Sequence, residues 1–204
     1  MSIKRTTALA ALILSAGTGG ATQIPSLPAP DQTASVLQEI AVTQAFEARV
    51  NDYVLLHRLL EGPLPPLTMT RDITTVQASM RRLALRIQRA RANAVQGDLI
   101  TPDVGRIFRR RIVASLPPEQ WAAIFADNAA EEEDVRIGPP PALCVNMEWP
   151  AQVLFGFVPP QLLARLPLLP PELQYRIIGN SLVLWDHHAN LIVDFLPDAF
   201  TVTS

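Results

Sequence analysis

The sequence predicts an α+β fold, with a helical N-terminal region of about four helices and a small C-terminal three-stranded antiparallel meander. Three observations lead to this prediction. Apolar residues recur at steps of three and four through the first half of the chain, as on one face of a helix. Prolines become frequent after Arg136. Short runs of strand-favouring residues, separated by turn residues, then lie near the C-terminus.

The N-terminus has the pattern of a secretory signal peptide. Lys4 and Arg5 precede a short apolar run, residues 8–14, and small residues follow it. This order is typical of such peptides, and cleavage is expected after Ala21. The apolar run is shorter than the roughly 20 residues that a membrane-spanning helix needs. We therefore expect residues 1–21 to direct export, to the periplasm or outside the cell, and no transmembrane segment after cleavage.

The first helix is predicted from about Thr33 to Leu60, after an extended lead-in over residues 22–32 that is rich in proline and small residues. Gly62 and the prolines that follow it end the helix. One helical face is apolar and consists of Val42, Phe46, Val50, Tyr53, Leu56 and Leu60.

The second helix has the most regular pattern. Asp72 can cap it, and Gly97 closes it. Its apolar residues follow in alternating steps of three and four, which is a heptad stripe. They are Ile73, Val76, Met80, Leu83, Ile87, Ala90 and Ala94. Because only a short loop separates the two helices, we expect this stripe to pack antiparallel against the first helix.

Two more helices complete the helical region, which spans residues 33–134. Thr101 is a suitable N-cap for the third, with Pro102 in its first turn. A short fourth helix is expected to begin near Pro118, with its aromatic residues facing inward. The acidic run at 129–134 is interpreted as a solvated boundary.

A proline-rich connector, with one short helical turn, is expected over residues 135–172, and the meander over residues 173–199. Gly179-Asn180 and residues 186–190 separate the strands, and such short gaps indicate hairpins. The predicted strands are 175–178, 182–185 and 191–195.

Charge excludes one class of function. The formal net charge is −2, and Lys4 is the only lysine. Removal of the signal peptide leaves an acidic chain whose cations are all arginine. A nucleic-acid-binding protein needs a dominant basic surface, so we expect no nucleic-acid partner.

A resemblance rests on three stretches, Tyr53–Leu67, Ala90–Val104 and Leu166–Leu196. They read "YVLLHRLLEGPLPPL", "ARANAVQGDLITPDV" and "LPLLPPELQYRIIGNSLVLWDHHANLIVDFL". Together they resemble an uncharacterised family of exported bacterial proteins. No activity is known for that family, so the resemblance implies no catalytic or binding residue. The terminal hairpins also resemble the small hairpin modules of periplasmic nickel and cobalt homeostasis proteins of the RcnB type.

Asp186, His187 and His188 are the candidate metal ligands. Zinc and copper accept such side chains. However, neighbouring residues of an extended segment point to opposite sides, so the two histidines do not readily chelate one ion. A metal site also needs three or four ligands, and His57 is the only other histidine. We therefore predict a solvent-facing turn here and a packed boundary histidine at position 57.

Two arginine clusters are candidates for binding an anionic partner. The alternative is that they pair with the acidic first helix, and we favour this alternative because charged faces on paired helices are common. The residues are Arg82, Arg86, Arg89, Arg109, Arg110 and Arg111.

Cys144 is the only cysteine, so a disulfide within the chain is impossible. Its apolar neighbours favour burial. Glu148 also lies between apolar residues, where a carboxyl group can act as an acid, but no second carboxylate is selected. A GxSxG nucleophile signature is lacking.

The sequence therefore favours a non-catalytic exported module that binds an envelope protein or an anionic ligand, with no catalytic residue and no cofactor. The first alternative is a periplasmic metal-binding or metal-homeostasis protein that uses Asp186, His187 and His188. An envelope hydrolase is the third possibility.

Overall fold

The computed structural model describes residues 30–64, 73–135, 142–150, 153, 155–156 and 158–200. The predicted signal peptide and most of the lead-in lie outside these residues. The helices of the described part are α1 (Pro30–Glu61), α2 (Ile73–Ala90), α3 (Pro102–Val113), α4 (Pro118–Val135) and the single turn α5 (Pro160–Leu163). The strands are β1 (Leu173–Ile178), β2 (Ser181–Asp186) and β3 (Leu191–Leu196). The predicted α+β fold class is confirmed.

The sheet is an antiparallel meander in the order β1-β2-β3, as predicted. Tyr175 lies opposite Leu184, and Leu184 lies opposite Asp194. The register of β2 and β3 shifts between Leu184 and Trp185. Gly179 has φ +50 in the first hairpin turn, a conformation that glycine adopts without steric cost. Asp186 is the last residue of β2, and its side chain contacts Tyr53 and His57 of α1, so this end of the strand lies against α1.

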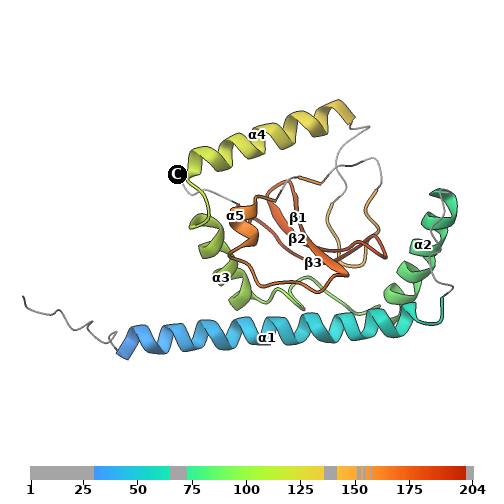
Figure 1. Cartoon of the computed structure of the whole chain (residues 1–204), viewed down its shortest axis with the longest axis horizontal. Coiled ribbons are helices and arrows are strands. Elements are labelled where there is room, and N and C mark those ends of the chain that lie inside the picture. The colour runs from blue at the N-terminus through green and yellow to red at the C-terminus, as the bar shows by residue number, and fades with distance from the viewer. Residues whose placement is uncertain are drawn as a thin grey trace, which may run out of the picture.

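The sheet lies at the centre of the molecule, with helices around it (Figure 1). The long helix α1 runs along one side and α4 along the opposite side, while α3 and α2 lie toward the two ends of the sheet (Figure 1). No helix in the described ranges is long and apolar enough to cross a lipid bilayer. A three-stranded sheet is marginal by itself, so these helices supply the surface that it packs against.

One hydrophobic core joins the helices to the sheet. Phe46 of α1 meets Phe108 of α3 edge to face, with ring centroids 5.2 Å apart, and Phe108 meets Tyr175 of β1 at 6.2 Å. Leu182 and Leu184 of β2 belong to the same buried cluster. Full burial of one such side chain contributes roughly 1.5–3 kcal/mol, so this cluster fixes α1 against the sheet.

The second helix packs differently from the expectation. It runs toward the end of α1 and contacts it there, but it lies steeply inclined to α1 instead of alongside it, so the expected antiparallel pair is wrong (Figure 1). Ile73, at the start of the heptad stripe, is 68% exposed, whereas Leu83 and Ile87 are buried. Near the end of α2, Gln88 donates to the Asn146 carbonyl at 2.9 Å. The C-terminal half of the stripe therefore packs into the core that α1 shares with the sheet, and its neighbour Arg86 donates to the Leu60 carbonyl of α1.

The fourth helix is longer than expected. It has 18 residues, includes the acidic run at 129–134, and ends at Val135, where the connector was predicted to begin. The acidic run therefore continues the helix. Trp121 is buried, and its ring lies 5.0 Å from that of Phe200, so the aromatic residues at the start of α4 face inward as predicted.

Asp194 of β3 fastens the sheet to the chain between α2 and α3. Its buried carboxylate accepts backbone N–H bonds from Gly97 at 2.9 Å and from Leu99 and Ile100 at 2.8 Å each. Thr101 then caps α3 through a bond from the Val104 amide, as predicted. Two of the stretches that carry the family resemblance therefore meet through one carboxylate.

Candidate metal centre

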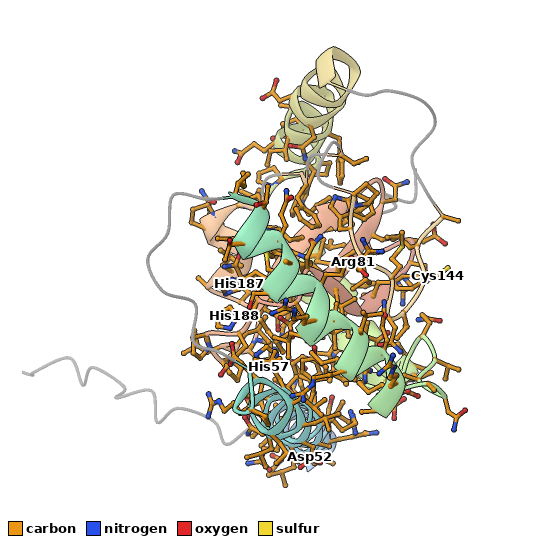
Figure 2. All side chains as sticks on the ribbon, turned by 90° about the vertical axis from the view of Figure 1, so that its right-hand side faces the viewer. Asp52, His57, Arg81, Cys144, His187 and His188 are labelled. Atoms are coloured by element: carbon orange, nitrogen blue, oxygen red, sulfur yellow. The ribbon has the colours of Figure 1, made fainter. Side chains whose placement is uncertain are left out.

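Three residues one helical turn apart build one side of the site. Tyr53, His57 and Glu61 are spaced at i, i+4 and i+8 along α1, and residues at such spacing lie above one another on the same helix face. The end of β2 and the turn that follows it face this stripe and contribute Asp186 and His188. In Figure 2 the three histidines lie on the same side of α2, and His57 is the one nearest α1.

Asp186 is completely buried, which contradicts the expectation of a solvent-facing turn. Its Oδ2 accepts a bond from the Tyr53 hydroxyl and one from His57 Nδ1, both at 2.6 Å. Its Oδ1 accepts the backbone N–H groups of His188 at 3.0 Å and Ala189 at 2.9 Å. These four donors replace the water that a buried carboxylate loses. The side chain therefore turns inward, because its partners are inside the molecule.

The hydrogen bonds also keep Asp186 ionised. Burial by itself would raise its pKa, but the bonds from His57 and Tyr53 and the positive charge of a protonated His57 outweigh burial and lower the pKa. A fixed negative charge therefore lies against Nδ1 of His57.

His57 is fully buried, and not the boundary residue that we expected. Burial tends to lower its pKa, but the bond to Asp186 and the charges of Asp186, Glu61 and Glu172 raise it overall. Its Nδ1 is occupied by Asp186. Its Nε2 is buried and has no hydrogen-bond partner among the described residues, although Oε2 of Glu61 lies 3.4 Å away. One ring nitrogen is thus held in place, and the other is available.

His188 faces the same point from the β2–β3 turn. Its Nδ1 is likewise buried without a hydrogen-bond partner in the described ranges, and it lies 3.4 Å from Oε1 of Glu61. The rings of His57 and His188 are 5.5 Å apart. One donor atom each from His57, Glu61 and His188 lie within 4.8 Å of one another.

These distances suit a shared metal ion. Ligand atoms bound tetrahedrally at about 2.1 Å from zinc lie about 3.4 Å from one another. The two nitrogen-to-oxygen separations have this value, to Oε2 of Glu61 from His57 and to Oε1 from His188. The three donors lie within 4.8 Å of one another, so a small closure brings them onto one ion. Two imidazoles and one carboxylate are also a donor set that zinc accepts.

Of the three sequence candidates, the structure brings His188 into this group and leaves Asp186 and His187 outside it. Asp186 lies behind His57, on Nδ1. His187 points elsewhere, with Nε2 2.7 Å from the carbonyl oxygen of Pro171. Sequence reasoning did not select His57 and Glu61 as ligands. Their i, i+4 spacing on one helix face was the only available signal.

Glu172 and Arg58 border the site. Glu172 precedes β1 and is 5% exposed. The Nε of Arg58, the residue after His57, donates to Glu172 Oε1 at 2.6 Å. Burial would raise the pKa of Glu172, but Arg58 and a protonated His57 lower it overall. A second ionised carboxylate is therefore fixed close to His57.

The arginine clusters mostly contact the protein itself. Arg110 and Arg111 both bind Glu39 of α1, at 2.7 and 3.0 Å, which is the intramolecular pairing that we favoured. Arg109 donates to the Pro197 carbonyl at 2.8 Å, and Arg86 donates to that of Leu60 at 2.7 Å. Arg82 and Arg89 are exposed on α2.

Cys144 is exposed, so the predicted burial is wrong. In Figure 2, Cys144 lies on the opposite side of α2 from the three histidines. Met147 and Trp149, from the same stretch, are partly and fully buried and pack in a second small cluster under the sheet. Met147 and Trp149 are therefore the residues of this stretch that bury apolar surface, while Cys144 is exposed.

Comparison of the chain with models of protein families, with curated proteins and with solved structures found no match.

Proposed function

We propose that this is an exported, non-catalytic binding protein whose ligand is a divalent transition-metal ion, held by His57, Glu61 and His188. One observation carries the proposal: two buried imidazole nitrogens without hydrogen-bond partners converge on a single carboxylate. A buried polar atom without a partner costs roughly 1–3 kcal/mol, and an ion bound between these atoms removes that cost.

The hydrogen bonds around His57 also favour a metal site. Histidine ligands typically donate their second ring N–H to a carboxylate, which fixes the tautomer and makes the ligating nitrogen more basic. Asp186 accepts from Nδ1 of His57 at 2.6 Å and is itself held by Tyr53. Nε2 is therefore the ring nitrogen left for the ion, and because the pKa of His57 is raised, the ion displaces a proton from it.

The kind of ion follows from the donor set. Imidazole nitrogen with carboxylate oxygen suits zinc, copper, nickel and cobalt, whereas magnesium and calcium prefer oxygen ligands alone. Export is supported by the charged, apolar and small-residue pattern of residues 1–21. The likeness of the hairpins to periplasmic metal-homeostasis modules points the same way.

The test is a titration of the metal-free protein with Zn²⁺, followed by calorimetry and by metal analysis after gel filtration. We expect one ion per chain. His188→Ala should weaken binding by at least 10-fold, because a ligand contributes no less than the outer partners, whose loss costs 10–100-fold. His188 is only partly buried, so this change should leave the fold intact.

The matched control is His187→Ala. This neighbour lies outside the group of donors, so its removal should leave the affinity unchanged. Absence of stoichiometric Zn²⁺ in the unmodified protein, or an equal loss in both variants, would exclude the proposed site.

A further inference from the structure

Glu172 has the same pattern of contacts as His57. One atom of each side chain is held by a charged neighbour: Nδ1 of His57 by Asp186, and Oε1 of Glu172 by Arg58, both at 2.6 Å. The other atom of each, Nε2 and Oε2, is buried and has no hydrogen-bond partner within the described ranges. Ligating carboxylates are commonly held by such an outer hydrogen bond.

The backbone places Glu172 beside the site. Leu173 pairs with Asp186 at the first position of the β1–β2 ladder. One residue further, the carbonyl oxygen of Glu172 accepts the His187 N–H at 3.2 Å. Glu172 therefore lies across the ladder from the turn that carries His188, and Arg58 ties it to the helix residue next to His57.

The charges of the site give an independent reason to expect a bound cation. The site contains three buried or partly buried carboxylates, Asp186, Glu61 and Glu172. Two arginines lie near them: Arg58 binds Glu172, and Arg91, over the Tyr53 ring, acts on Asp186. Without an ion and with neutral histidines, negative charge is in excess. A divalent ion offsets this excess next to the buried carboxylates of Asp186 and Glu172, where uncompensated charge is costly.

We propose that Glu172 is the fourth ligand, so that the ion is held by two histidines and two glutamates in a closed tetrahedral site. This inference rests on the metal-binding function proposed above. Glu172 is outside the three donors that lie within 4.8 Å of one another. Ligation therefore requires Oε2 to move toward the ion while Oε1 remains on Arg58.

The number of protein ligands has a functional consequence. Catalytic zinc sites keep one coordination position for water or substrate, whereas sites with four protein ligands are closed. A closed site favours retention or transfer of the ion over hydrolysis.

The test uses Co²⁺, whose visible absorption is more intense in four-coordinate than in six-coordinate sites. The loaded full chain should show the intense four-coordinate spectrum. Titration with azide, which enters an open coordination position, should leave that spectrum unchanged. A spectral change with azide would show an open position and overturn the inference, and this measurement needs no variant.

Glu172→Gln provides the second test. It should weaken Co²⁺ binding by at least 10-fold and make the spectrum sensitive to azide. Glu119→Gln is the matched control, because it makes the same change at an exposed glutamate of α4; its affinity and spectrum should equal those of the unmodified chain. If Glu172→Gln leaves affinity and spectrum unchanged while the unmodified chain binds Co²⁺, Glu172 is not a ligand and the proposed function still stands. If the unmodified chain binds no Co²⁺, both proposals fail.

Discussion

At the scale of single residues, the pair formed by Asp186 and His57 shows how burial decides chemistry. Both side chains are fully buried and joined at 2.6 Å. Removing one partner of such a pair leaves an uncompensated buried charge, which typically costs about 3–5 kcal/mol. The pair is therefore a structural requirement of the fold, whichever ligand Nε2 of His57 binds.

The shifted pKa values predict how the stability of the metal-free protein depends on pH. The pKa of His57 is raised above 6.5, so its contribution is complete below pH 6.5 and is lost as the pH rises through the folded-state value. The pKa of Asp186 is lowered below 3.8, so its contribution is present above pH 3.8 and is lost on further acidification. Together they favour folding most between these two values.

We therefore expect the free energy of unfolding in urea, measured with a chelator present, to fall as the pH rises above 6.5. His57→Gln should flatten this part of the profile, because it removes the titrating group. A slope that persists in the variant would assign the dependence to other residues.

At the scale of secondary-structure elements, buried carboxylates join segments that are distant in the sequence. Asp194 connects β3 to the junction between α2 and α3, and its partners lie 94 to 97 residues earlier in the chain. Asp186 does the same between β2 and α1. Each carboxylate satisfies several backbone or side-chain donors at once, so each fixes the position of a whole element.

Asp194→Asn should lower the free energy of unfolding by about 3 kcal/mol. Hydrogen bonds to charged groups contribute roughly 1.5–3 kcal/mol each, and the substitution replaces one accepting oxygen by an NH2 group that can only donate. Amide exchange at Gly97, Leu99 and Ile100, followed by NMR, should accelerate most.

Asp98→Asn is the control for this prediction. Asp98 accepts a single exposed bond from the Val95 amide, and its substitution should cost less than about 1 kcal/mol. An equal effect of the two substitutions would contradict the role assigned to Asp194.

At the scale of the whole molecule, the proposed ion bridges the longest helix and the sheet. His57 and Glu61 lie on α1, whereas His188 lies in the β2–β3 turn. The unfolded chain separates these ligands, so metal binding is linked to global folding and not only to local order.

Zn²⁺ at 100 times its dissociation constant should therefore raise the free energy of unfolding by about 2.7 kcal/mol. Urea denaturation with and without the ion measures this increase. His188→Ala should abolish most of it, and His187→Ala should retain it. An unchanged midpoint in the unmodified protein would mean that the folded state has no preferential affinity for the ion.

The sequence predicted those features of the fold that depend on residues close together in the chain. The Thr101 cap, the hairpins at Gly179-Asn180 and at residues 186–190, and the α+β class depend on neighbouring residues, so periodicity and turn chemistry were sufficient. α2 does contact α1, but the expected antiparallel arrangement was wrong, because a heptad stripe specifies an apolar partner and not the angle at which the helix crosses it.

The site itself was decided by tertiary structure. His57 and Asp186 are 129 residues apart, and nothing in either segment indicates that one will supply the other's hydrogen bond. By itself, the segment Asp186–Asn190 has the composition of an exposed turn. Only its packing against α1 buries Asp186, orients His57 and brings His188 to Glu61, because desolvation forces each buried polar atom to find a partner across the fold.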